Sequence, residues 1–600
     1  MCGIAGLALR KTDTELQQRF ARISKTYLQT RGPDSFNSKS INYNADGVID
    51  MHHARLSIID ISGGAQPMSD SNGTLVYNGE IYNFKDIRDT TANYETRSDT
   101  EVLLRGLSGD PFRFLNRASG MFAFGYHDER NHRIIIARDG FGIKPVYFLK
   151  NDNAFAFAST LHPLMALSKK EINEQALLEY YMSRGMRGSN TIFKDVIEVQ
   201  PGLAYMLDLD TWELTCLNWQ TERPILQRSS NEADLAAELD DILTASVERH
   251  LISDVPVAAL LSGGIDSSLI TALAAGKTDR LTAFTLGFRD KAYDESDYAA
   301  ALARRYGLKH HIVYCEDNDF LALLDKWPLV MDDAVANPST VLLYAISNFA
   351  REAGHKVLLA GEGADEFFGG YHQQWRFTLA KRLHTLGRLA PFVPSMIDRF
   401  APHKTRLVNA ARMATQRCSF YGTSTIFEPH MIKRTFSVQP GSVPQAGTLH
   451  DALQLDQKYR LPDDMLTATD RATMHASVEA RVPFITREVS DFAASLPEHL
   501  LISGFTQKVL LRKVARAHVP DNCIDRRKVG FDLPLSRWFR TTLRDRLVGA
   551  MWNSWQKDYF RPGALEQVVD WHMTGKADMP DKLWAFMLLE NNVRALRSIH

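Results

Sequence analysis

The sequence predicts two domains of different fold class: a sheet-dominated α+β region, then an α/β region with a parallel sheet and a helical C-terminal part. The chain has 600 residues, which is more than a single hydrophobic core usually serves. Short apolar strands alternate with turn residues at first, whereas buried strands alternate with helical patterns further along the chain. The change of pattern separates the two domains.

The N-terminal region is expected to contain short strands separated by Gly, Asn and Asp. These strands are 3–9, 75–77, 121–126, 134–137, 154–158 and 203–207. A polar segment at about 220–230 then predicts a linker. We therefore expect a first domain at 1–215, a linker at 216–232 and a second domain at 233–600.

The second region is expected to begin with an amphipathic helix at 235–247. Buried strands follow at 257–261, 281–286 and 356–360, and helices at 267–275 and 298–305. Strands that alternate with helices predict a parallel sheet. The last part of the chain has mainly helical patterns.

Composition excludes several classes of function. The net charge is −1 and no dense basic block occurs, so no nucleic-acid partner is expected. No apolar stretch approaches the roughly 20 residues of a membrane span, and the N-terminus does not resemble a signal peptide. The five cysteines are far apart in the sequence, which argues against a disulfide framework and CxxC sites. A cytoplasmic protein is the default expectation.

Cys2 is a candidate nucleophile because of its position. Removal of the initiator Met would leave Cys2 with a free α-amine, whose pKa near ~8 allows it to act as a base. Such an amine can activate its own thiol without a histidine. A cysteine at this position usually has no role, so the hypothesis depends on the motifs that follow.

Six motifs occur in order through the N-terminal half. They are MCGIAG at the start, RGPD at 31–34, HARLSIID at 53–60, YNGEIYN at 77–83, SDTE at 98–101 and RD at 138–139. With them the sequence resembles the class II glutamine amidotransferases, in particular the glutamine-hydrolysing asparagine synthetase family. The resemblance implies an N-terminal-nucleophile glutaminase domain, a sheet sandwich with helices, in which Cys2 frees ammonia from glutamine.

The resemblance also assigns the residues that bind glutamine. Arg55 is suited to hold the substrate carboxylate through a bidentate pair. Asp99, helped by Glu80, would take the ammonium group. The Asn78 amide and the Gly79 N–H would stabilise the oxyanion that forms during attack.

Two of these motifs have simpler structural interpretations. Asn78-Gly79 is also typical of a tight hairpin turn. Arg138-Asp139 is expected to be a structural ion pair at a strand end, not a catalytic element.

A glycine-rich loop, SGGIDSS at 262–268, lies between a predicted strand and a helix. Glycines let a phosphate approach the backbone at a helix N-terminus, and the missing Gly-Lys-Ser/Thr ending excludes a Walker A loop. The loop resembles that of ATP pyrophosphatases, which implies an ATP-pyrophosphatase-type synthetase domain that adenylates a carboxylate. Asp266 among phosphates requires a cation, so Mg²⁺ is implied.

A second acidic loop, GEGADEFFGG at 361–370, follows another buried strand and is expected at the same sheet edge. The resemblance makes Asp365 a second Mg²⁺ ligand and Glu362 the base that deprotonates attacking ammonia. The residues it assigns to ATP are Leu261, Ser262, Gly263, Gly264, Asp266, Ser267, Ser268, Leu286, Ala360 and Gly361. Leu261, Leu286 and Gly361 would contact the adenine.

Later motifs complete the resemblance. Those at 461–465, 470–474 and 477–484 are similar to the helical wall of the synthetase pocket. In the motif at 526–531, Lys528 would stabilise charge on the adenylate and the departing pyrophosphate. An Arg-Arg-Lys run is usually solvated surface, so the role of Lys528 depends on the resemblance.

The acceptor is left open by the sequence. Three functions remain. The first is an enzyme that amidates aspartate to asparagine, and the second is a sibling enzyme that amidates another carboxylate. The third is an inactive binding homologue. Ala360 and Thr486 depart from the common family pattern in the half that chooses the acceptor. Related intramolecular cyclases often lack the terminal cysteine, so Cys2 argues against them. A homodimer is a family expectation.

Overall fold

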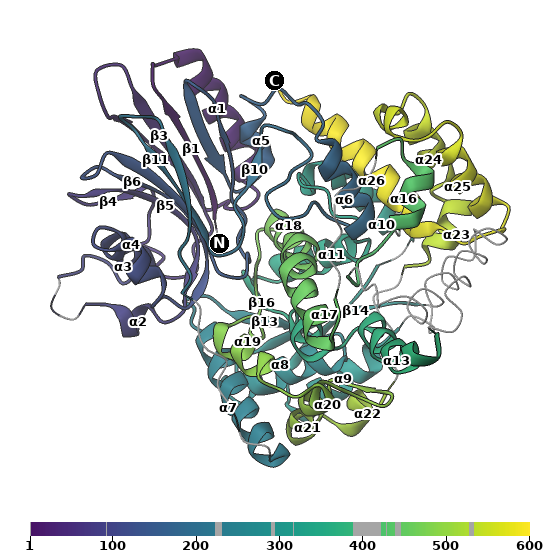
Figure 1. The fold of residues 1–600 in the computed structure, drawn as a ribbon. Coiled ribbons are helices and arrows are strands. Elements are labelled where there is room, and N and C mark those ends of the chain that lie inside the picture. The colour runs from purple at the N-terminus through teal and green to yellow at the C-terminus, as the bar shows by residue number, and fades with distance from the viewer. Residues whose placement is uncertain are drawn as a thin grey trace.

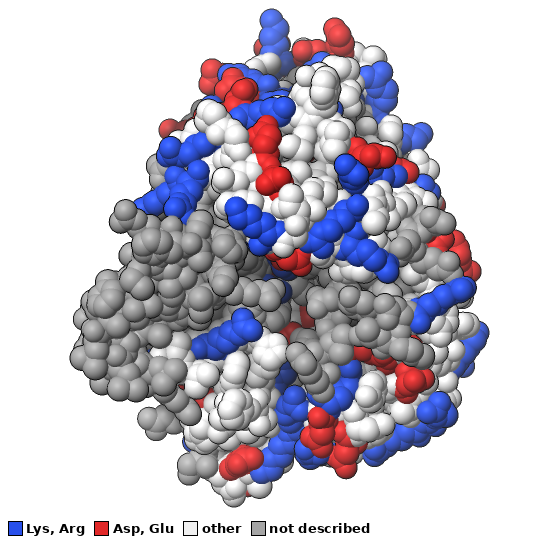
Figure 2. Space-filling view, turned by 90° about the vertical axis from the view of Figure 1, so that its right-hand side faces the viewer, with Lys and Arg blue, Asp and Glu red and all other residues white. Residues whose placement is uncertain are grey.

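The computed structural model describes residues 2–600, apart from 90, 92, 222–227, 229–230, 290–293, 316, 388–421, 428, 439–445 and 527–532. The two halves of the chain form two bodies that pack side by side, with the N-terminus between them (Figure 1). On the face in Figure 2, Lys and Arg are interspersed with Asp and Glu, and the surface is hollowed near the middle. Among the described residues, no helix is both long enough and apolar enough to cross a membrane.

The N-terminal half contains two six-stranded antiparallel sheets. The first has the order β10-β8-β9-β1-β3-β2, with β1 (Gly3–Leu9), β2 (Ser35–Asn42), β3 (Val48–Arg55), β8 (Tyr147–Lys150), β9 (Ala154–Ala158) and β10 (Ile197–Glu198). The second has the order β12-β11-β7-β6-β5-β4, with β4 (Met68–Ser69), β5 (Gly73–Ile81), β6 (Gly120–Asp128), β7 (Arg133–Arg138), β11 (Leu203–Asp208) and β12 (Leu214–Asn218).

The two sheets stack face to face over an apolar core. Ile4, Met51 and Phe157 of the first sheet pack with Val76 and Ile136 of the second. Helices α1 (Thr14–Leu28) and α5 (Leu161–Leu164) cover the first sheet, and α2 (Phe84–Ile87), α3 (Asp99–Leu107) and α4 (Pro111–Leu115) lie beside the second. Helix α6 (Glu174–Ser183) reaches the other half, where the Tyr180 hydroxyl donates to the Ala585 carbonyl.

The C-terminal half is organised around a parallel five-stranded sheet of order β15-β14-β13-β16-β17. The strands are β13 (Val257–Leu260), β14 (Thr282–Gly287), β15 (Lys309–Tyr314), β16 (Val357–Leu359) and β17 (Glu479–Arg481). The chain runs outward from β13 to β15 and then returns to β16 on the other side of β13. Strands β13 and β16 therefore form a switch point, where open α/β sheets bind ligands.

Helices surround this sheet and form the rest of the half (Figure 1). They are α7 (Glu232–His250), α8 (Ile265–Ala275), α9 (Ser296–Arg305), α10 (Asp317–Val330), α11 (Ser339–Glu352), α12 (Ala364–Phe368), α13 (His372–Gly387), α16 (Pro429–Thr435), α17 (Leu449–Leu455), the π-helix η1 (Asp456–Leu466), α18 (Thr467–His475), α19 (Arg487–Ala494), α20 (Glu498–Leu501), α21 (Val509–His518), α22 (Asp521–Ile524), α23 (Leu535–Arg540), α24 (Arg544–Met551), η2 (Trp555–Tyr559), α25 (Ala564–Met573) and α26 (Pro580–Arg597). A short hairpin, β18 (Ile502–Ser503) with β19 (Thr506–Gln507), precedes α21.

The predicted fold class is confirmed, and the elements differ from expectation mainly at their ends. Helix α8 begins at Ile265, two residues before the expected start, because Gly264 is its N-cap. Strand β15 was not predicted; it carries polar side chains, which gave no buried-strand signal. Strand β12 continues to Asn218 and α7 begins at Glu232.

Candidate active sites

Cys2 lies at the interface of the two sheets of the N-terminal half. It immediately precedes β1, whose Gly3 pairs with Ala54 of β3, so the register brings Cys2 close to Arg55. The Cys2 backbone N–H donates to Asn78 Oδ1 at 3.0 Å. Burial raises the pKa of the Cys2 thiol, while a backbone hydrogen bond from Leu56 and the charge of Arg55 oppose the rise.

Asn78-Gly79 lies within β5, opposite Phe122 and Ala123 of β6, so the hairpin-turn interpretation is wrong. The Asn78 Nδ2 group is buried and has no hydrogen-bond partner among the described residues. A Cβ on Gly79 would lie 2.1 Å from the Met121 carbonyl oxygen. The close approach of the paired strand therefore requires glycine here.

Arg55, Glu80 and Asp99, the residues expected to bind the charged ends of glutamine, are all at least nine-tenths buried. Arg55 donates to the backbone carbonyls of Asp60 at 2.6 Å and Ile61 at 2.8 Å, which fixes its guanidinium. Asp99, at the start of α3, accepts from the Tyr77 hydroxyl and the Ile81 N–H. Burial raises the pKa of the Asp99 carboxyl, and these two hydrogen bonds oppose the rise.

Glu80 connects this region to the other half of the chain. Its Oε1 lies 3.4 Å from the guanidinium of Arg481 on β17, and its Oε2 has no partner among the described residues. Burial raises the pKa of Glu80 well above its usual value, and the nearby Glu479 and Asp99 raise it further.

Arg138 and Asp139 have structural contacts, but they do not form the expected pair with each other. Arg138 forms its ion pair with Glu198 at 2.6 Å and donates to the Gly142 and Lys144 carbonyls. Asp139 instead accepts N–H groups of the following loop, including that of Phe141. The two residues therefore hold the turn after β7.

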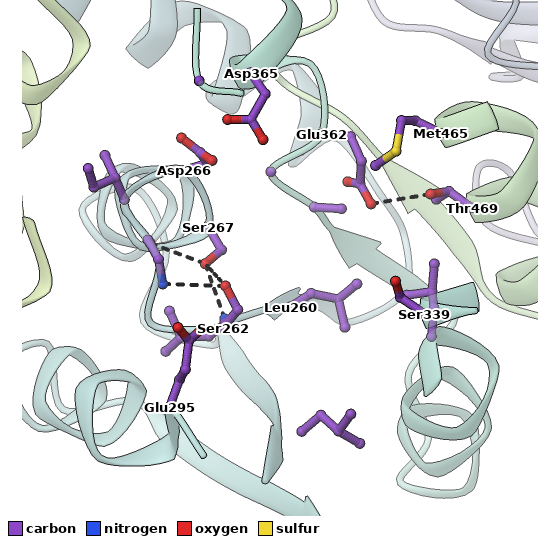
Figure 3. A pocket seen from close by; sticks show the side chains of 18 of the residues that line it. Leu260, Ser262, Asp266, Ser267, Glu295, Ser339, Glu362, Asp365, Met465 and Thr469 are labelled. Carbon is purple, nitrogen blue, oxygen red and sulfur yellow. Dashed lines mark hydrogen bonds between the residues drawn. The ribbon is translucent and has the colours of Figure 1, made fainter. Parts of the chain in front are cut away.

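The loop after β13 is held by its own serines (Figure 3). Ser267 Oγ lies 2.9 Å from Ser262 Oγ and accepts the Ser262 backbone N–H at 3.1 Å. Gly263 has φ +73°, and a Cβ there would meet the backbone of Ala299. The loop thus leads directly to the N-terminus of α8, and a helix N-terminus offers backbone N–H groups and a positive dipole to a phosphate.

The second acidic loop follows β16 and contacts the first. A Cβ on Gly361 would lie 2.9 Å from the Ser267 backbone nitrogen, so the two loops are packed against each other. Glu362 is directed into the pocket that they share, and Thr469 on α18 donates to its carboxylate at 3.2 Å (Figure 3). Burial raises the pKa of Glu362, whereas the Thr469 hydrogen bond lowers it.

Asp266 and Asp365 face the same space from the two loops (Figure 3). The ammonium of Lys508 lies between them, 2.7 Å from Asp266 and 2.5 Å from Asp365. The described residues contain no group of three or more His, Cys, Asp or Glu side chains suited to a metal ion. The two carboxylates nevertheless fit Mg²⁺, which usually takes one or two protein carboxylates and completes its shell with phosphate oxygens and water.

Lys508 was missed by the sequence reasoning. It precedes the amphipathic helix α21, where a lysine is normally solvated, and no motif spacing singles it out. Its left-handed backbone, with φ 54°, turns it toward the pocket. Lys528 lies outside the described residues. Arg526, from the same motif, donates to the Gly263 carbonyl at 3.2 Å and so contacts the first loop.

The other residues expected to bind ATP gather in the same pocket. Those that line it are Leu261, Ser262, Gly264, Asp266, Ser267, Leu286, Ala360 and Gly361. Gly263 supports the loop from outside this lining, and Ser268 is fully buried in α8. Of the two departures from the family pattern, Ala360 borders the pocket, whereas Thr486 is the N-cap of α19.

Comparisons with known proteins agree with this two-part arrangement. Residues 1–219 match the glutamine amidotransferase domain, and residues 238–594 match the asparagine synthase family. The chain is 29% identical to the glutamine-hydrolyzing asparagine synthetase 1 of Bacillus subtilis (strain 168), over 98% of this chain and 96% of that protein. It is 30% identical to a putative glutamine-hydrolyzing asparagine synthetase of Mycobacterium bovis, over 94% of this chain and 91% of that protein. Asparagine synthetase B of Escherichia coli (strain K12) is 29% identical, over 64% of this chain and 67% of that protein.

Proposed function

Because this chain belongs to the asparagine synthase family, we propose that it transfers ammonia from glutamine to an ATP-activated carboxylate, and that aspartate is the acceptor. The relatives are ligases named for glutamine hydrolysis and asparagine synthesis, and the chain is an enzyme of this class. The resemblance inferred from the sequence motifs is thereby confirmed.

Glutamine hydrolysis would begin with removal of Met1, which frees the α-amine of Cys2. The amine takes the thiol proton, and the sulfur attacks the amide carbon of glutamine. The Asn78 amide and the Gly79 N–H stabilise the resulting oxyanion. Ammonia leaves with a proton returned by the amine, and water then releases glutamate from the thioester.

One observation carries this part of the proposal. Asn78 accepts a hydrogen bond from the Cys2 backbone through Oδ1, while its buried Nδ2 has no partner among the described residues. A buried, unpaired donor costs stability, on the order of 1–3 kcal/mol. A donor left in this state beside a nucleophile is suited to an oxyanion that forms only during the reaction.

In the second site an acceptor carboxylate would attack the α-phosphorus of ATP, and pyrophosphate would leave. Ammonia then attacks the acyl-adenylate, Glu362 takes a proton from the nitrogen, and AMP departs. Lys508 lies between the two loops, where its charge can stabilise the departing pyrophosphate. Mg²⁺, held by Asp266 and Asp365, would neutralise phosphate charge.

The acceptor is tested by measuring pyrophosphate release with Mg-ATP and ammonium over a panel of carboxylates, aspartate first. We expect aspartate to give the highest rate, and the Asp266→Ala variant to release no pyrophosphate with any acceptor. A signal with another carboxylate but not with aspartate would assign the chain to the sibling class. Release that persists in Asp266→Ala would contradict the proposed ATP site.

A further inference from the structure

Arg31 links the nucleophile to the other half of the chain. Its Nε donates to the Cys2 carbonyl at 3.2 Å, and its two terminal nitrogens form a bidentate pair with Asp470 of α18 at 2.7 and 3.1 Å. Both side chains are almost completely buried, with exposed fractions of 3% and 2%. Figure 1 shows the N-terminus on the side of the sandwich that faces α18.

The position of Arg31 is fixed by its own backbone as well. The N–H groups of Arg31 and Gly32 both donate to the Leu28 carbonyl at the end of α1. A Cβ on Gly32 would lie 2.1 Å from the Ala54 carbonyl oxygen, so this turn presses directly against β3. The backbone of Arg31 is therefore held by α1 and β3, and its guanidinium is held by Asp470 and the Cys2 carbonyl.

Asp470 is surrounded by three cationic side chains. Besides Arg31 it contacts the Lys144 ammonium at 3.6 Å and the Arg471 guanidinium at 3.2 Å. Burial alone would raise the pKa of the Asp470 carboxyl, but Arg31, Lys144 and Arg471 outweigh burial and hold the pKa well below its usual range. These three cationic side chains therefore favour the ionised form of the carboxylate.

The residue next to Asp470 contacts the other candidate centre. Thr469 donates to Glu362, the proposed base of the synthetase site. Thr469 and Asp470 are adjacent on α18. Thr469 contacts Glu362, and Asp470 contacts Arg31, which in turn binds the Cys2 carbonyl.

We propose that Asp470 is a positioning residue of the glutaminase centre, so that this centre is completed by the C-terminal half of the chain. The proposal rests on the proposed function of Cys2. Asp470 orients Arg31, and Arg31 holds the Cys2 carbonyl so that amine and thiol keep the geometry needed for attack. Asp470 has no contact with Arg55 or Asp99, so it acts on turnover and leaves glutamine binding to them.

The test is steady-state glutamine hydrolysis by the full-length Asp470→Asn variant, without ATP or acceptor. A misplacement of about 1 Å can reduce a rate by roughly a hundredfold, so we expect kcat to fall about 10- to 100-fold. The KM for glutamine and the Kd for Mg-ATP, measured by calorimetry, should each stay within about threefold, since one factor of three is under 1 kcal/mol.

Asp456→Asn is the matched control, because Asp456 is equally buried and accepts hydrogen bonds from Thr423 and Gln374 but has no contact with Arg31. A second variant, Asp470→Glu, keeps the negative charge and serves as the test if Asp470→Asn does not fold. It should also lower kcat, by less than Asp470→Asn, with unchanged KM.

The outcomes separate the two proposals. Wild-type protein that does not hydrolyse glutamine would overturn the proposed function and this inference together. Hydrolysis by the wild type, with kcat of the Asp470 variants no lower than that of Asp456→Asn, would overturn this inference alone. A fall in kcat accompanied by equal losses in glutamine and Mg-ATP binding would indicate a structural role and also overturn it.

Discussion

Glu362 is the proposed base of the synthetase site, and Thr469 is hydrogen-bonded to its carboxylate. As a base, Glu362 must be ionised, so activity is lost when the pH falls below the pKa of its carboxyl. Burial raises this pKa and the Thr469 hydroxyl lowers it. The acidic limb of the pH profile should therefore lie above the range of an ordinary glutamate.

Replacement of Thr469 by valine removes the hydrogen bond that favours the ionised form. The pKa of Glu362 should rise, and the acidic limb of ammonium-supported synthesis should move upward by roughly 0.5 to 1 pH unit. Thr473→Val is the control, because the Thr473 hydroxyl donates only to the Thr469 carbonyl in its own helix. If the acidic limb of the pH profile stays in place in Thr469→Val, or moves equally in both variants, Glu362 is not the base.

At the scale of single elements, strand β5 carries Asn78 and Gly79, the proposed oxyanion pair, and its pairing with β6 leaves no space for a side chain at Gly79. A methyl group there would meet the Met121 carbonyl oxygen, which belongs to the partner strand and cannot rotate away. We expect Gly79→Ala to lower the free energy of unfolding by about 1–3 kcal/mol, as overpacking does elsewhere.

Chemical denaturation of the two-domain chain, followed by far-UV circular dichroism, measures this loss. Gly549→Ala is the control, since a Cβ at Gly549 on α24 has nothing within 4 Å and alanine favours a helix. Equal stability of the two variants would mean that β5 and β6 leave room for a methyl group at Gly79.

The elements also show what the sequence could predict. Asp266 and Asp365 each follow a buried strand of a parallel sheet, and open α/β sheets bind ligands at the carboxyl edge of their strands, so the sequence could predict that both lie at the same edge. Asn78-Gly79 has the composition of a turn, and only the tertiary pairing of β5 with β6 decides that it is strand. Lys508 could not be predicted, because its contacts join helix α21 to loops far away in the sequence.

At the scale of the whole molecule, the two halves meet through buried charges. Arg31 pairs with Asp470 and Glu80 lies beside Arg481, and both of these pairs are buried, whereas Lys356 binds Asp34 at 2.7 Å in a partly exposed pair. Burying such groups is costly unless each has a partner, so these pairs fix one relative placement of the halves. A fixed placement suits a reaction in which ammonia must pass from one site to the other without being trapped as ammonium in water.

Two separate centres are proposed to share ammonia, and replacement of Cys2 by alanine separates their activities. Product formation is measured with Mg-ATP and the acceptor found by pyrophosphate release, once with glutamine and once with ammonium. Cys216→Ala, at an exposed cysteine, is the control. We expect Cys2→Ala to lose glutamine-supported synthesis by at least about a thousandfold and to keep ammonium-supported synthesis within about threefold, because only the nucleophile is removed. Loss of both activities, or persistence of glutamine-supported synthesis, would contradict two separate centres with Cys2 as the glutaminase nucleophile.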